Sequence, residues 1–201
     1  MRITAAEKHA TRRRIVETAR ELFRTHGFDA TTTRDIARAA EIAAGTLFNY
    51  FDSKEAVAVT LAAEALHKAR TAFGNRPVEG TLEEELFALV AAEMRHLKPM
   101  RQFLTPLLEV AFTPLASTKQ AAGHEALRIE HLEIVVVIAR RHGLAEIPTL
   151  SLQAYWALYT GVLAFWTADK SPKQEDTLAL LDQSLNMFVA WLRHAAGESA
   201  T

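Results

Sequence analysis

Cysteine is absent from this sequence of 201 residues, and glycine and proline are scarce, with 8 and 6 copies. Without cysteine, neither a disulfide nor a thiolate metal site can form. Few helix breakers, abundant Ala and Leu and few strand-favouring runs favour helices. No apolar stretch approaches the ~20 residues of a membrane-spanning helix, and the basic N-terminus lacks the apolar core of a signal peptide. We therefore expect an all-α protein that is soluble and cytoplasmic, with no membrane partner and no cofactor.

Positive charge is concentrated near the N-terminus. Residues 1–54 hold 10 Lys and Arg against 7 Asp and Glu, whereas residues 55–201 hold 13 against 17. A basic N-terminal unit on an acidic body is typical of a protein that binds a polyanion at one end.

Capping residues and helix breakers divide the chain into about nine helices. Thr4 and Glu7 form a capping-box pattern before the first helix, and Gly27 can end that helix with a positive φ. Ser171, with Gln174 three residues later, predicts the same kind of start for the last helix. The expected helices span about residues 4–26, 32–40, 44–51, 53–73, 81–98, 100–112, 119–142, 149–168 and 171–196.

The segment 32–57 reads TTRDIARAAEIAAGTLFNYFDSKEAV and predicts two short helices with a tight turn between them. Its apolar residues are spaced to form a small shared core, made of Ile36, Ala37, Ala40, Ile42 and Leu47. The remaining residues form an outer face, made of Ala44, Gly45, Thr46, Phe48, Asn49 and Tyr50. A recognition helix contacts base edges with its first residues in the major groove, and small residues there let its backbone approach the duplex.

This segment resembles the TetR family of transcriptional regulators. It shares with that family Thr32-Thr33, Ile36-Ala37, Gly45-Thr46-Leu47, Tyr50-Phe51 and Ser53-Lys54-Glu55-Ala56. The resemblance implies a helix-turn-helix DNA-binding domain at residues 1–53 and a ligand-binding and dimerisation domain at residues 54–201. It also implies a homodimeric repressor that a small hydrophobic ligand releases from a pseudo-palindromic operator. The preference for repression over activation comes from the resemblance alone.

By position, the resemblance assigns phosphate contacts to Thr33, Thr46, Tyr50 and Lys54, and base contacts to Arg34, Gly45 and Asn49. Ala44 and Phe48 complete the predicted DNA-binding set. Arginine can bond guanine in a bidentate manner, and asparagine can bond adenine. The alternatives are a solvated charge for Arg34 and Lys54, and core packing against Phe51 for Tyr50.

Two positions depart from the family pattern. Glu41-Ile42-Ala43 stands where Gly-Val-Ser is usual, so the turn lacks a glycine and Ala43 cannot cap the following helix, which costs ~1 kcal/mol. Phe48 replaces the usual tyrosine and lacks its phosphate-contacting hydroxyl. Both departures bear on the strength of DNA binding more than on the fold.

The resemblance also implies a ligand pocket among the middle helices and a dimer interface on the last two. The candidate pocket residues are Leu66, Met94, Phe103, Leu104, Leu108, Phe112, Ile134, Tyr155, Trp156 and Tyr159. The candidate interface residues are Tyr159, Leu163, Trp166, Leu180, Ser184, Met187 and Trp191. A second apolar stripe on the last helix supports the interface, because one stripe suffices for packing against the body. Core packing is the alternative for both sets.

Histidine spacing offers two metal-based alternatives. Glu64-x-x-His67 and Glu93-x-x-His96 have the spacing of di-iron carboxylate enzymes, in which Glu109 and Glu133 would supply further ligands. In the second alternative, His124 and His131 lie seven residues apart on one helix face and bind a metal effector of the repressor. The helix-turn-helix pattern outweighs both, so we predict neither a metal site nor a catalytic residue.

Overall fold

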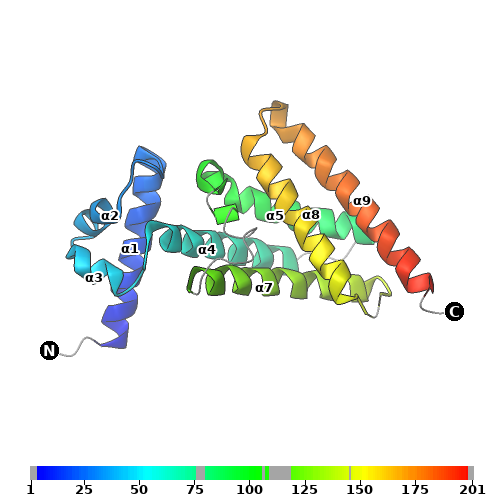
Figure 1. Cartoon of the computed structure of the whole chain (residues 1–201), viewed down its shortest axis with the longest axis horizontal. Helices are drawn as coiled ribbons and strands as arrows, with labels where there is room; N and C mark the ends of the chain where they lie inside the picture. Colours follow the sequence, from blue (N-terminus) through cyan, green and yellow to red (C-terminus); the bar gives the residue numbers. More distant parts are fainter. Residues whose placement is uncertain (1–3, 76–79, 106, 109–118, 145, 199–201) are drawn as a thin grey trace.

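The computed structural model describes residues 4–75, 80–105, 107–108, 119–144 and 146–198. Every regular element in these ranges is a helix, which confirms the all-α prediction. They form eight α-helices, close to the nine expected, and two 3-10 helices (Figure 1). The elements are α1 (Ala5–His26), α2 (Thr33–Ala39), α3 (Ala44–Phe48), α4 (Lys54–Gly74), α5 (Leu82–Leu97), η1 (Lys98–Phe103), α7 (Lys119–Arg141), α8 (Thr149–Ala168), η2 (Pro172–Gln174) and α9 (Glu175–Glu198).

The first three helices form a small unit around a shared core, which we call the DNA-reading unit (residues 5–53). Ile15, Ala19 and Phe23 on the inner face of α1 are buried. Ile36 on α2 and Leu47 on α3 are fully buried against them. The predicted core of the 32–57 segment is confirmed, because its members are buried or, at position 42, half-buried.

α4 connects the DNA-reading unit to the body. Figure 1 shows it running from α1 into the larger lobe, where α5 and α7 lie beside it and α8 and α9 form an antiparallel pair across the far end. The buried residues of both lobes belong to one continuous hydrophobic cluster. None of the described helices is long and apolar enough to cross a membrane.

Four of the helix starts follow local capping patterns. The capping boxes at Thr4, Thr32 and Thr81 are all formed, each with the carboxylate three residues later. The hydroxyl of Ser53 accepts a hydrogen bond from the backbone N–H of Ala56, and so caps α4. These contacts satisfy backbone N–H groups that have no partner within the helix.

The predicted capping box of Ser171 and Gln174 is wrong. Lys173 and Gln174 adopt positive φ angles, so a short 3-10 turn precedes α9. Two other contacts cap the start of α9: the Asp169 carboxylate accepts hydrogen bonds from the backbone N–H of Ser171 and of Thr177, and the Ser171 hydroxyl accepts one from the backbone N–H of Asp176. The pKa of Asp169 is lowered, first by the hydroxyl of Thr177 and then by the hydrogen bonds from Ser171.

The expected helix at 100–112 also differs in its first part. Residues Lys98–Phe103 form the 3-10 helix η1, with a proline at its start. Residues 105 and 107–108 are helical, whereas residues 106 and 109–112 lie outside the described ranges. Pro99 favours this tight turn because its fixed φ suits a helix start and it has no N–H to donate.

Candidate nucleic-acid interface and ligand pocket

The turn between α2 and α3 is built without glycine. Glu41 takes the left-handed conformation with φ 54°, at a cost on the order of 1–2 kcal/mol for a residue with a side chain. The backbone N–H of Ile42 donates to the carbonyl of Ala37 at 3.0 Å and holds the turn. As predicted, Ala43 gives α3 no side-chain cap. The turn therefore forms, but Glu41-Ile42-Ala43 stabilises it less than the usual Gly-Val-Ser sequence would.

The predicted DNA-binding residues form an exposed face on α2 and α3. Arg34, Ala44, Gly45, Phe48 and Asn49 are exposed, and the side chains of three others in this set are half-buried, at 33, 46 and 50. Phe48 is 51% exposed, which is unusual for an aromatic ring. A Cβ added at position 45 would meet no atom within 4 Å, so no packing requires that glycine. This face is open for a large partner.

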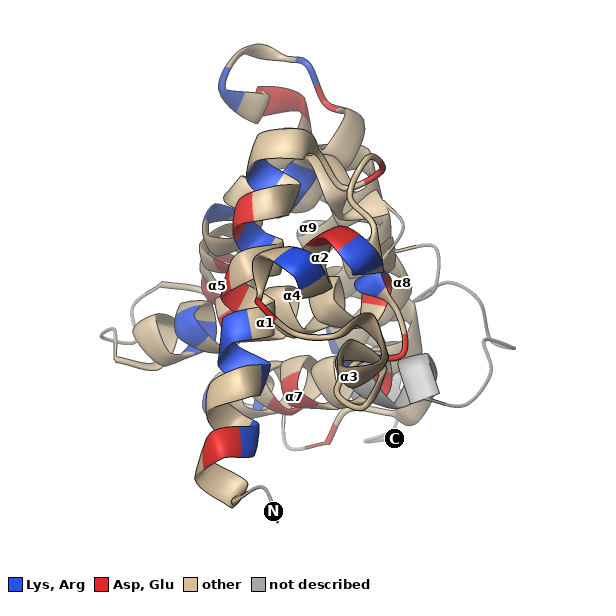
Figure 2. Ribbon diagram, turned by 90° about the vertical axis from the view of Figure 1, so that its left-hand side faces the viewer, with Lys and Arg blue, Asp and Glu red and all other residues tan. Residues whose placement is uncertain are grey.

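α3 is shorter than the sequence predicts. It ends at Phe48, with Asn49 as its C-terminal cap, so the polar residues at 49 and 50 lie in the turn that follows. Figure 2 looks onto this end of the molecule and shows Lys and Arg on α1 and α2, while α3 carries no charge. The positive charge at this end therefore lies on the flanking helices, and α3 itself is uncharged.

Lys54 lies at the rear of this unit and is engaged within the protein. Its ammonium donates to the carbonyl oxygens of Phe28 at 2.7 Å, Asp29 at 3.3 Å and Thr31 at 3.1 Å. It also sits 4.4 Å from the centre of the Phe28 ring. An ammonium has three N–H donors, and three carbonyls accept them here. The phosphate contact expected of Lys54 stays a prediction, and its position ties α4 to the loop between α1 and α2.

A pocket opens between α4, the segment around η1, α7 and α8. Five of the predicted residues line it, namely Leu66, Leu104, Leu108, Trp156 and Tyr159. Sequence reasoning missed Val59, Ala62, Arg70, Leu97, Leu107, Leu127, Thr160 and Leu163. On α4, the lining residues at 59, 62, 66 and 70 recur at helical spacing, and this stripe was a readable signal.

Four predicted pocket residues lie elsewhere, and one cannot be placed. Met94, Phe103 and Tyr155 are buried and Ile134 is half-buried, but none of them borders the pocket. Phe103 points instead to the DNA-reading unit, where its ring meets those of Phe23 and Phe28. Position 112 lies outside the described residues.

A buried ionic network adjoins the pocket at Arg70. The Arg70 guanidinium donates from Nε to Glu93 at 2.8 Å, and from its two terminal nitrogens to Glu130 at 2.9 Å and to the carbonyl of Leu127 at 3.3 Å. His131 lies 3.0 Å from the same Glu93 oxygen. These contacts join α4, α5 and α7 in the interior.

Electrostatics in this network favour an ionised Glu93. Burial alone raises the pKa of this carboxyl, but His131 and then Arg70 outweigh burial and lower the pKa to about 2. Burial raises the pKa of Tyr159 well above its ordinary value, and the negative charge of Glu93 adds to the rise. The other Glu93 oxygen, Oε2, receives no hydrogen bond from the described residues.

The arrangement of histidines and carboxylates does not resemble a metal centre. No group of three or more potential ligands comes together among the described residues. Glu64 forms an ion pair with Arg20 at 2.8 Å, whereas Glu93 belongs to the Arg70 network. The side chains of His124 and Glu109 lie outside the described residues.

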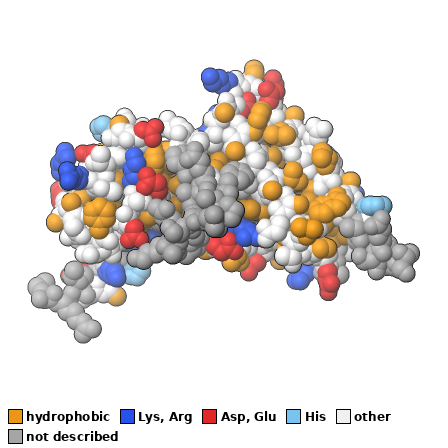
Figure 3. Space-filling model, in the orientation of Figure 1, with side chains coloured by type: hydrophobic (Ala, Val, Ile, Leu, Met, Phe, Trp, Pro, Cys, Tyr) orange, Lys and Arg blue, Asp and Glu red, His pale blue; other side chains and the backbone are white. Residues whose placement is uncertain are grey.

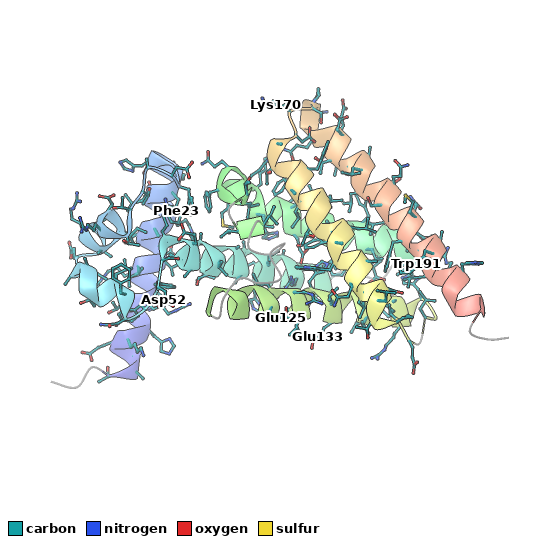
Figure 4. The ribbon with its side chains drawn as sticks, in the orientation of Figure 1. Phe23, Asp52, Glu125, Glu133, Lys170 and Trp191 are labelled. Carbon is teal, nitrogen blue, oxygen red and sulfur yellow. The ribbon has the colours of Figure 1, made fainter. Side chains whose placement is uncertain are left out.

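The predicted dimer residues divide into two groups. Tyr159, Leu163, Trp166 and Ser184 are buried within the single chain. On α9, Met187 is 63% exposed and Trp191 41% exposed, and both share a helical stripe with the half-buried Leu180. Figure 3 shows hydrophobic side chains gathered over α8 and α9, and Figure 4 shows Trp191 on the outer side of α9. We call the residues at 180, 184, 187 and 191 the α9 stripe.

Comparison with known proteins agrees with this geometry. Residues 15–61 match the model of the family described as bacterial regulatory proteins, tetR family. The HTH-type transcriptional regulator UidR of Escherichia coli K12 is 35% identical over 74 residues, which are 37% of this chain and 37% of UidR. The chain thus matches well under half the length of these curated relatives.

Solved structures resemble the chain over nearly its whole length. The Thermus thermophilus repressor FadR, of the TetR family and in complex with lauroyl-CoA, is 26% identical, with a TM-score of 0.68. The match covers 89% of this chain and 93% of FadR. A TetR regulator from Rhodococcus sp. RHA1 shares the fold with a TM-score of 0.71 at 19% identity, over 90% and 97% of the two chains.

The two short helices with their exposed face, carried on a helical body, define a helix-turn-helix regulator. The family match falls on that unit, and the fold extends the likeness to the rest of the chain. The helix-turn-helix segment matches that of the TetR family of transcriptional regulators, and the whole chain has the fold of a TetR-family repressor. That family is one of transcriptional regulators.

Proposed function

We propose that the protein is a repressor that binds a pseudo-palindromic operator as a homodimer, in the cytoplasm, through residues 1–53. The carrying observation is the exposed face of α2 and α3, where Arg34 and Asn49 stand beside small residues that let the backbone approach DNA. The same unit matches the TetR family model. Two copies related by a two-fold axis would read two half-sites and so gain specificity.

Selection of bound duplexes from a random pool tests this proposal. The selected sites should be inverted repeats, and affinity should fall steeply with salt because phosphate contacts release counterions. Placed between a promoter and its start site, the selected operator should reduce transcription in vitro when the protein is added. Binding without sequence preference at low salt would contradict the proposal.

We propose further that residues 54–201 bind a small apolar effector in the pocket described above. The lining is apolar, with Arg70 as the one charged residue among the described lining residues. FadR of Thermus thermophilus, which resembles this chain, is described in complex with lauroyl-CoA, so a long acyl chain is the first effector to test.

Calorimetry with lauroyl-CoA measures this binding, and free coenzyme A is the matched control that lacks the acyl chain. We expect heat of binding from lauroyl-CoA only. Leu66→Asp places a charge in the pocket wall and should abolish that binding. Binding that persists in Leu66→Asp would place the ligand elsewhere.

We propose that the dimer forms through the α9 stripe and the adjoining face of α8. Met187 and Trp191 are large apolar side chains that a single chain leaves in water. Patches of this kind usually mark an interface. Light scattering at micromolar concentration should give the mass of two chains, and the mass of one chain would overturn the proposal.

A further inference from the structure

Three phenylalanine rings close the junction between the DNA-reading unit and the body. Phe23 on α1 and Phe28 just after α1 belong to the unit, while Phe103 ends η1 in the body. Ring centroids are 5.0 Å apart for Phe23 and Phe28, 5.4 Å for Phe23 and Phe103, and 5.8 Å for Phe28 and Phe103. All three rings are buried, and Figure 4 labels Phe23 on α1. The body thus contributes one ring to the core of the unit.

The segment that carries Phe103 also borders the pocket. Leu97, just before η1, and Leu104, just after it, both line the pocket. Leu107 and Leu108 line it too, and their backbone N–H groups each donate to the carbonyl of Leu104 at 2.9 Å. A ligand that displaces the backbone at Leu104 also shifts Phe103, because a single peptide group joins the two residues.

η1 is anchored at its middle. The Nε of Arg101 donates to the carbonyl of Trp166 at 2.8 Å, and a terminal nitrogen bonds the carbonyl of Asp169. The guanidinium also lies 5.6 Å from the centre of the Trp166 ring. These contacts hold the middle of η1 to the end of α8. A displacement of Leu104 therefore acts on the last residue of η1, which is Phe103.

Phe28 receives a second connection, from α4. The Lys54 ammonium lies 4.4 Å from the centre of the Phe28 ring and donates to the Phe28 carbonyl at 2.7 Å. Lys54 is the first residue of α4, and Val59 and Ala62 on the next turns of that helix line the pocket. Two walls of the pocket therefore contact the DNA-reading unit at Phe28. The α4 wall does so through Lys54, at the start of the same helix, and the η1 wall does so through the stacked ring of Phe103.

We propose that Phe103 is a positioning residue that transmits occupancy of the pocket to the DNA-reading unit by pressing on Phe28 and Phe23. The inference rests on the proposed function, because it requires that a filled pocket changes operator affinity. The unit is attached to α4 by the chain link at residues 51–53 and by the ion pair of Arg20 with Glu64 at 2.8 Å. A second attachment at Phe103 fixes its tilt, so that the tilt follows the position of η1.

The test measures coupling, defined as the ratio of operator affinities of the full-length protein with the pocket empty and filled. Ala62→Phe fills the pocket without a ligand, and lauroyl-CoA is an independent probe. In the otherwise wild-type protein we expect each to weaken operator binding by about tenfold or more. With Phe103→Leu, which keeps an apolar side chain but removes the ring, we expect a change below about threefold.

Phe73→Leu is the matched control, because Phe73 is also buried but lies at the far end of α4. It should keep the wild-type coupling. If Phe103→Leu loses helical circular dichroism, Phe103→Met replaces it. Equal coupling in the Phe103 variant and in wild type overturns the inference. Wild-type protein that binds its operator specifically but shows no coupling with either probe also overturns it. Loss of specific DNA binding in wild type contradicts the proposed function itself, and the inference with it.

Discussion

At the scale of single residues, Arg34 is the clearest candidate for reading bases. It is exposed at the start of α2, and no ion pair with another described side chain involves it. Arg34→Ala should relax base preference at one position in each half-site and cost ~1–3 kcal/mol at the preferred site. Repeating the duplex selection with the variant measures this change.

Arg38→Ala provides the comparison. Arg38 is also exposed on α2 but pairs with Asp35 at 2.9 Å, one turn earlier. We expect its removal to leave the selected sequence unchanged. If both variants select the wild-type site, Arg34 does not contact a base.

Lys54 is expected to act through the fold. Lys54→Met removes the donor for three carbonyls but keeps a long apolar side chain, so stability should fall by roughly 1–3 kcal/mol. A phosphate contact would instead lower the slope of log affinity against log salt by about one. We expect a lower melting temperature, and an unchanged slope would contradict the phosphate contact predicted for Lys54. Lys68→Met, at an exposed position of α4, is the control.

The sequence indicated the residue types of the interface but not all their partners. Fixed offsets from Thr32 to Ala56 located the exposed face, because they depend only on local helix geometry. The contacts of Lys54 span more than 20 residues of sequence, to a loop whose path no local pattern specifies. The sequence also placed Phe103 in the pocket, because its neighbour Leu104 does line the pocket. The contacts of Phe103 with Phe23 and Phe28 join residues far apart in the sequence, and no local pattern specifies them.

At the scale of helices, the α9 stripe should control assembly. Met187→Glu combined with Trp191→Lys places charges where the other copy would pack, so association should be lost while each chain stays folded. Operator affinity should fall sharply, because one half-site alone gives little binding energy. Light scattering and circular dichroism check mass and helix content together.

Leu150→Glu is a suitable control for these variants. Leu150 is a large exposed apolar residue at the start of α8, outside the α9 stripe. It should remain dimeric. A dimer that survives both changes in the α9 stripe would show that the interface lies on another surface.

The network of Glu93, which ties three helices together, should make stability depend on acid. Its pKa in the folded protein, about 2, lies below the ordinary 4.5. The ionised form is thus favoured by folding, and this stabilisation is complete above about pH 4.5 and is lost as pH falls towards 2. Glu93→Gln should be less stable at neutral pH by about 3–5 kcal/mol.

Thermal melts of Glu93→Gln and wild type between pH 7 and pH 3 measure this effect. The difference in melting temperature should shrink as pH falls, because wild type loses a contribution that the variant lacks. Glu133→Gln changes an exposed carboxylate on α7 and should follow the wild-type profile. A constant gap between Glu93→Gln and wild type at every pH would contradict the prediction.

Helix starts were more predictable than helix ends and connections. The capping boxes at Thr4, Thr32 and Thr81 formed because donor and acceptor lie three residues apart on one turn. The contact of Asp169 with Thr177, eight residues later, needs the chain reversal between α8 and α9. The 3-10 helix η1 had a local signal in Pro99, whereas no local pattern indicated that α3 ends at Phe48.

At the scale of the whole molecule, linkage gives a quantitative check on induction. If an acyl effector weakens operator binding by some factor, operator DNA must weaken effector binding by the same factor. Titrating lauroyl-CoA into the free protein and into its operator complex measures that second factor. A ligand with equal affinity for both forms is not the inducer, however tightly it binds.

The continuous hydrophobic cluster has a consequence for how the molecule comes apart. Buried residues run from Ile15 on α1 to Leu192 on α9 without a solvated seam, and Phe103 completes the core of the DNA-reading unit. Unfolding should therefore be a single cooperative transition, in which a ligand bound in the body also slows amide exchange in α1. A fragment cut after residue 53 would expose the rings of Phe23 and Phe28 to water and should be a poorly folded peptide.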